Sequence, residues 1–149
     1  MRILVLIDGS KWSQKAALHA IAIAKRKGWK ITLFSAMDWR EAKVLAFNVG
    51  MRIQDLEDVR KFEEEVWHEM KKDIRETMTN LLEFCHEEGV NCSIRIVEGV
   101  ARKAVLEEAN SGKYGLVVMG AYGRSGKTRI GSLLEEVIGQ IKPPTMVVR

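Results

Sequence analysis

The sequence has only two cysteines, Cys85 and Cys92, and this scarcity limits the kinds of site that it can build. They lie seven positions apart, form no CxxC pair, and have no cluster of histidines beside them. A metal site is therefore not expected. We expect two free thiols in a reducing compartment, which points to the cytoplasm.

Long apolar runs are missing as well. No stretch approaches the roughly 20 apolar residues that a membrane-spanning helix needs. The apolar start from Met1 to Ile7 is too short for a signal peptide. We therefore expect no membrane association and a cytoplasmic location.

The excess of one charge sign is small. The chain carries 24 basic and 20 acidic residues, which gives a net charge of +4 at pH 7. This excess is too small and too evenly spread to predict a nucleic-acid partner. It suits a small anionic ligand better.

Motifs for catalysis are also lacking. The GxSxG nucleophile motif does not occur, and the three histidines, His19, His68 and His86, fall within predicted helices. Gly126-Lys127-Thr128 is similar to the end of a Walker A loop, but five residues separate Gly120 from Gly126 where that motif has four. We therefore reject the Walker interpretation and do not expect an enzyme.

What the chain does have is a regular alternation of apolar strands and amphipathic helices. Strands are predicted over 3–7, 31–37, 92–97, 116–119 and 145–148, and helices over about 10–27, 53–88, 100–110 and 132–141. The segment 39–50 receives no assignment. Continuous apolar strands alternating with helices predict an α/β fold, with a doubly wound parallel sheet in a single domain spanning 1–149.

In such a sheet, ligands bind beyond the carboxyl ends of the strands, where the strand order reverses. Two strand-to-helix loops are candidates for that place. The first is Asp8-Gly9-Ser10, whose carboxylate can accept hydrogen bonds from a ribose or an adenine amino group. Turn stabilisation alone would explain Asp8 equally well.

The second candidate loop runs from Gly120 to Ser132. Its glycines allow backbone N–H groups to converge on an anion, and the helix after it adds further donors. Its cations are Arg124, Lys127 and Arg129. A mobile surface loop with solvated cations is the alternative, but the concentration of these features at a strand end favours an anion site.

With these loops in place, the chain resembles the universal stress protein family over nearly its whole length. The resemblance rests on six motifs in this order: Ile3-Leu4-Val5-Leu6-Ile7-Asp8-Gly9-Ser10, Val97-Glu98-Gly99, Val117-Val118-Met119-Gly120, Gly123-Arg124, Gly131-Ser132 and Met146-Val147-Val148. It implies a Rossmann-like fold of the adenine nucleotide alpha hydrolase type. Five parallel strands in the order 3-2-1-4-5 would carry helices on both faces.

The resemblance also implies a small regulatory stress-response protein that binds ATP or AMP, with or without Mg²⁺. The implied phosphate and ribose contacts are Gly120, Gly123, Gly131 and Ser132, and the implied base or ribose contacts are Asp8, Ala36 and Met119. Arg124 and Lys127 would add positive charge. Seven residues separate Gly123 from Gly131, however, where the family pattern has nine, and Leu6 stands where many members have proline.

The shortened loop keeps two alternatives open. One is a stress protein that binds no nucleotide and acts as an interaction module for an unknown protein partner. The other is a weak ATPase, in which Asp8 or Asp38 would assist a magnesium ion brought by the nucleotide. The family resemblance further implies a homodimer paired through the C-terminal strand, which would otherwise be an open sheet edge.

Overall fold

The computed structural model describes residues 1–50, 56–123 and 137–149. Its elements, in chain order, are β1 (Arg2–Leu6), α1 (Lys11–Lys27), β2 (Lys30–Met37), α2 (Trp39–Gly50), α3 (Leu56–Glu87), β3 (Cys92–Glu98), α4 (Ala101–Ala109), β4 (Leu116–Gly120) and β5 (Thr145–Val148). Among the helices of these residues, none has both the length and the apolar character needed to cross a membrane.

All five strands are parallel and form one sheet in the order β3-β2-β1-β4-β5. The predicted fold class and strand order are thus confirmed. β1 lies at the centre, and Ile3, Leu4 and Val5 are completely buried. In the register of the sheet, Val5 stands opposite Leu33 of β2 and Val118 of β4.

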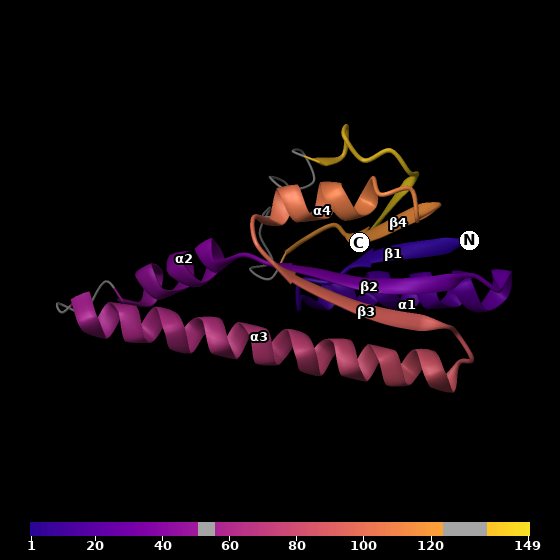
Figure 1. The fold of residues 1–149 in the computed structure, drawn as a ribbon. Helices are drawn as coiled ribbons and strands as arrows, with labels where there is room; N and C mark the ends of the chain where they lie inside the picture. The colour runs from indigo at the N-terminus through magenta and orange to yellow at the C-terminus, as the bar shows by residue number, and fades with distance from the viewer. Residues whose placement is uncertain (51–55, 124–136) are drawn as a thin grey trace.

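Helices cover both faces of the sheet, as Figure 1 shows. α1 and α3 pack on one face through a cluster that includes Ala20, Ile74 and Met78. α4 packs on the other face through a second cluster that includes Phe34 and Val105. Val137 and Ile141 belong to that second cluster, but most of the helix predicted over 132–141 lies outside the described residues.

The residues that the sequence indicates as the ends of α1 are the residues that cap this helix in the structure. The Ser10 hydroxyl accepts a hydrogen bond from the Ser13 backbone N–H at 3.1 Å, so Ser10 is the N-cap. Gly28 ends the helix in the left-handed conformation with a φ of 70°, which glycine adopts without steric cost. Lys25, Arg26 and Lys27 occupy the last turn, near the negative end of the helix dipole.

The segment 39–50, which the sequence left unassigned, forms α2. It packs against α3, and the two helices extend together beyond the carboxyl ends of the strands (Figure 1). The long helix predicted over 53–88 is confirmed as α3 within its described part, Leu56–Glu87. Both cysteines carry free thiols: Cys85 is buried and Cys92 is half-buried.

A close approach between β4 and α1 depends on Gly120. A Cβ atom at this position would lie 2.7 Å from the backbone carbonyl carbon of Trp12 and 2.9 Å from its carbonyl oxygen. Backbone atoms of a helix cannot yield as a side chain can. Gly120 is therefore required for the end of β4 to lie against the first turn of α1.

We predict that Gly120→Ala destabilises the fold by about 1–3 kcal/mol, because the added methyl group must displace the start of α1. Urea denaturation followed by circular dichroism measures this change. Gly139→Ala is the matched control, because a Cβ there meets nothing within 4 Å. Equal unfolding free energies for the two variants would contradict the close-packing account.

Candidate functional site

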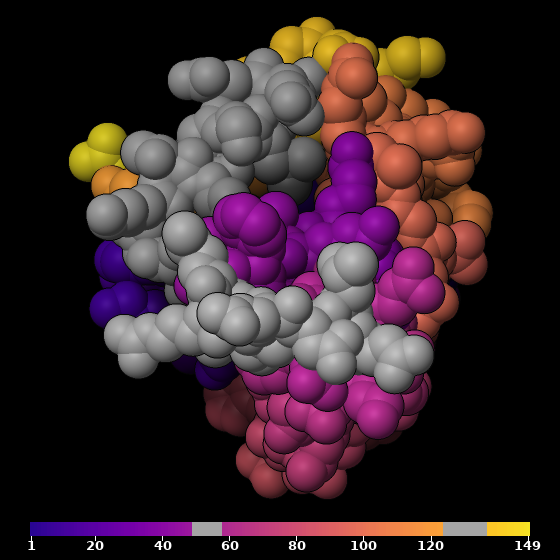
Figure 2. Space-filling model, turned by 90° about the vertical axis from the view of Figure 1, so that its left-hand side faces the viewer, coloured from indigo at the N-terminus to yellow at the C-terminus, as the bar shows by residue number. Residues whose placement is uncertain are grey.

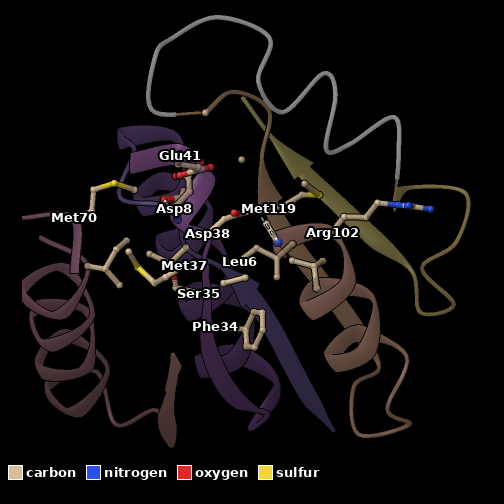
Figure 3. A pocket seen from close by; sticks show the side chains of 18 of the residues that line it. Leu6, Asp8, Phe34, Ser35, Met37, Asp38, Glu41, Met70, Arg102 and Met119 are labelled. Atoms are coloured by element: carbon tan, nitrogen blue, oxygen red, sulfur yellow. Dashed lines mark hydrogen bonds between the residues drawn. The ribbon is translucent and has the colours of Figure 1, made fainter. Parts of the chain in front are cut away.

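A cavity of about 400 Å³ opens at the carboxyl ends of β1, β2 and β4. In Figure 2, which looks onto this side of the molecule, α2 lies between α3 and α4. Residues from the strand ends, the following loops and all three of these helices line the cavity. Among them are Leu6, Asp8, Ala36, Asp38, Arg40, Glu41, Met70, Ile74, Arg102, Met119, Gly120 and Gly123 (Figure 3).

The structure brings together five of the nine residues proposed for the site from the sequence. Asp8, Ala36, Met119, Gly120 and Gly123 all line the cavity, although they come from three different strand ends. The other four, Arg124, Lys127, Gly131 and Ser132, lie outside the described residues. The contact of any of the nine with a ligand stays a prediction.

The two loops singled out from the sequence touch each other directly. The Ser10 hydroxyl donates to the Tyr122 carbonyl oxygen at 3.5 Å. The rings of Trp12 and Tyr122 meet edge to face, with their centroids 4.9 Å apart. This contact occurs because β1 is flanked by β2 on one side and β4 on the other, which is the reversal point where parallel sheets place ligands.

Asp8 serves the turn and also faces the cavity. Its Oδ1 accepts a hydrogen bond from the Ser10 backbone N–H at 2.9 Å, and its own N–H donates to the Ser13 hydroxyl at 3.3 Å. These bonds fix the direction of the carboxylate, which lines the cavity beside Glu41 (Figure 3). The two roles considered for Asp8 are therefore compatible in one geometry.

Asp38 joins two segments of the cavity wall through its hydrogen bonds. Its carboxylate accepts from the Arg40 backbone N–H at 3.0 Å and from Arg40 Nη2 at 2.7 Å. It also accepts from the Ala101 backbone N–H at 3.2 Å, 63 positions along the chain. Asp38 thus caps α2 and α4 at the same time, and we call this arrangement the Asp38 clasp.

The hydrogen bonds from Arg40 hold the pKa of the Asp38 carboxyl below its usual value, although burial acts in the opposite direction. The carboxylate is therefore ionised at neutral pH. Both of its oxygens accept hydrogen bonds from Arg40 or Ala101.

The sequence reasoning missed every cavity residue that α2, α3 and α4 supply. For α2 a usable signal existed, because Asp38-Trp39-Arg40-Glu41 has the N-cap and third-position acidic residue of a helix start. For Met70, Ile74 and Arg102 no local signal existed. Their position at the cavity depends on how α3 and α4 pack against the sheet.

Comparison with known sequences places the whole chain in one group. The model of the Universal stress protein family matches residues 1–149. A universal stress protein of Methanocaldococcus jannaschii is 30% identical over 150 residues, which cover 99% of this chain and 81% of that protein.

Solved structures show the same fold. The universal stress protein UspA from Lactobacillus plantarum aligns with a TM-score of 0.78 at 20% identity, covering 100% of this chain and 97% of the other. A universal stress protein in complex with cAMP gives 0.67 at 22% identity, covering 100% and 97%. An Arabidopsis thaliana member with AMP bound gives 0.65 at 15% identity, covering 99% and 90%.

The Asp38 clasp predicts a specific dependence of stability on pH. The pKa of the Asp38 carboxyl is lower in the folded than in the unfolded chain. The clasp therefore contributes its full stabilisation of the fold above the ordinary aspartate pKa of 3.8. That contribution is lost as the pH falls through this value toward the folded pKa. Asp38→Asn should therefore be less stable than the wild type at pH 7, and the difference should shrink as the pH falls below about 4.

Chemical denaturation at a series of pH values measures this difference. Asp58→Asn, at an exposed position of α3, is the control and should change stability little at any of them. A difference between wild type and Asp38→Asn that stays constant from pH 7 to pH 3 would refute the clasp.

Proposed function

The chain belongs to the universal stress protein family, and on that premise we propose that its cavity binds an adenine nucleotide, AMP or ATP, for regulation and not for turnover. The observation that carries the proposal is the meeting of Asp8, Ala36, Met119, Gly120 and Gly123 around one cavity at the reversal point of the sheet. Relatives of the same fold are known in complex with AMP and with cAMP.

The cavity chemistry supports such a ligand. Its volume of about 400 Å³ lies within the range of about 300–1,000 Å³ that is usual for small-molecule sites. Leu6, Ala36 and Met119 offer an apolar wall to a base, and Asp8 offers a fixed acceptor to a ribose or an amino group. Gly120 and Gly123 leave room for phosphate oxygens close to the backbone.

A binding role fits the positions of the histidines. The three histidines are exposed on α1 and α3, and none of them is among the residues that line the cavity. We therefore propose that nucleotide binding changes the affinity for a protein partner. The two free thiols suit a reducing compartment, and we infer a cytoplasmic location for the protein.

We predict that AMP or Mg-ATP binds with a Kd in the micromolar range, about −8 kcal/mol, in isothermal titration calorimetry. Asp8→Asn should weaken binding about tenfold or more, because it keeps the turn but removes the negative acceptor facing the ligand. Asp58→Asn on α3 removes the same charge away from the cavity and should leave the Kd unchanged. Absence of binding by both nucleotides would overturn the proposal in favour of an interaction module.

We also propose that the protein forms a homodimer through β5. This strand has four residues and pairs within the described chain only with β4, so its other edge is open to a second copy. Met146 and Val147 are half-buried there and would add apolar contact. A two-fold axis at this edge makes the contact self-complementary.

We predict a dimer in size-exclusion chromatography with light scattering, and a monomer for Val147→Lys, because the charge would be buried against the partner strand. Ile96→Lys on β3, at the opposite edge of the sheet, is the matched control and should remain dimeric. A wild-type monomer, or dissociation caused by Ile96→Lys in place of Val147→Lys, would contradict pairing through β5.

A further inference from the structure

The cavity reaches both faces of the sheet. Phe34 and Val105 line it from the side covered by α4 and belong to the cluster on that face. Met37, Met70 and Ile74 line it from the side covered by α3 and belong to the cluster on the other face. The cavity therefore passes over the carboxyl ends of β1 and β2, and we call its α3 side the α3-side arm.

The α3-side arm has an apolar lining. Met37 of β2, Met70 and Ile74 of α3, and Val44 of α2 form its walls, while Ser35 adds one hydroxyl. In Figure 3, Met70 and Met37 lie on the α3 side of Asp8, Asp38 and Glu41, and Arg102 and Met119 lie on the opposite side. Thioether side chains are flexible and adapt to apolar groups of varied shape.

Three carboxylates, those of Asp8, Asp38 and Glu41, stand between the two sides (Figure 3). The Asp38 carboxylate is paired with the Arg40 guanidinium and accepts a hydrogen bond from the Ala101 backbone N–H, and Asp8 is tied to its turn. No buried side-chain nitrogen or oxygen of the described residues lacks a partner. Between these carboxylates and α3, the cavity wall offers a ligand mainly apolar surface from Met37, Val44, Met70 and Ile74.

The proposed nucleotide would leave this arm unfilled. Successive side chains of a strand point to opposite faces, so Ala36 faces the α4 side and Met37 faces the α3 side. A base resting against Ala36, Leu6 and Met119 would thus lie on the α4 side. An apolar space next to such a base is suited to an apolar group of the same ligand.

We propose that the natural ligand is an adenine nucleotide bearing an apolar substituent, on its base or on its phosphate, and that the substituent occupies the α3-side arm. This inference rests on the proposed function, since the nucleotide part anchors the ligand at Asp8 and Gly120. It adds the class of ligand, because a plain adenine nucleotide does not account for the apolar α3-side arm.

The test compares three nucleotide probes by calorimetry: AMP, AMP alkylated at the adenine N6 position, and AMP carrying the same alkyl chain as a phosphate ester. The free alkyl alcohol is a fourth probe, which lacks the nucleotide. The readout is the ratio of the Kd of AMP to the Kd of each alkylated probe. Each methylene that enters the arm should tighten binding up to about fourfold. The probe that gains affinity identifies the attachment point.

Two variants fill the arm. Ile74→Phe adds volume from α3, and Val44→Phe adds it from α2, where the position is 51% exposed and the core is not at risk. Both should bring the ratio close to one. Val66→Phe on α3 is the control, because Val66 packs against the same core cluster without lining the cavity, and its ratio should match the wild type.

The outcomes separate this inference from the proposed function. If AMP binds and neither alkylated probe binds more tightly, the inference is overturned and nucleotide binding stands. The inference also fails if the alkylated probes still bind more tightly than AMP to both Ile74→Phe and Val44→Phe. It fails as well if a free alkyl alcohol binds as tightly as the alkylated nucleotides. If none of the three nucleotide probes binds, both are overturned.

Discussion

The burial of β1 on both faces of the sheet is the constraint on which the other features depend. Ile3, Leu4 and Val5 have no exposed surface, so β1 must have a strand on each side and a helical layer above and below. β2 and β4 are the flanking strands. The connections after β1 and after β2 place α1 and α3 on one face of the sheet, and the connection after β3 places α4 on the other face. The loops after β1 and β4 then meet at one edge of the sheet, and the cavity opens beside them over the carboxyl ends of β1, β2 and β4.

The cavity keeps its shape because its polar wall is internally bonded. Burying the Asp38 carboxylate costs free energy, which its hydrogen bonds to Arg40 and Ala101 offset. The same bonds hold the first turns of α2 and α4 together across the strand ends. Because α2 continues alongside α3, the wall extends beyond the reversal point and forms the arm lined by Met37 and Met70.

The strands could be predicted because each strand has a local signal. Continuous apolar runs such as Val117-Val118-Met119 mark buried parallel strands, and family motifs supplied the order. Asp8 and Gly120 could be named because they stand at or just after the ends of β1 and β4, and Gly123 was implied by the family's glycine motif. The start of α2 also has a local signal, because Asp38 and Glu41 stand at its N-cap and third helical position.

The remaining part of the site depends on contacts between distant segments. Asp38 accepts a hydrogen bond from the Ala101 backbone N–H, 63 positions along the chain, and no local sequence pattern predicts such a pair. Met70 and Ile74 look like ordinary core positions of an amphipathic helix, because the same spacing serves packing and cavity lining. Only the way α3 lies against β2 distinguishes these two roles.

The central claim is that the strand-end cavity is the ligand site, and nuclear magnetic resonance tests it most directly. Backbone amide shifts of ¹⁵N-labelled protein would be recorded while AMP is added to saturation. The account predicts that the largest shifts fall at Asp8, Ala36, Met119, Gly120 and Gly123, which line the cavity from three strand ends. Shifts confined to the exposed faces of α1 and α3, or no shifts at any amide, would contradict it.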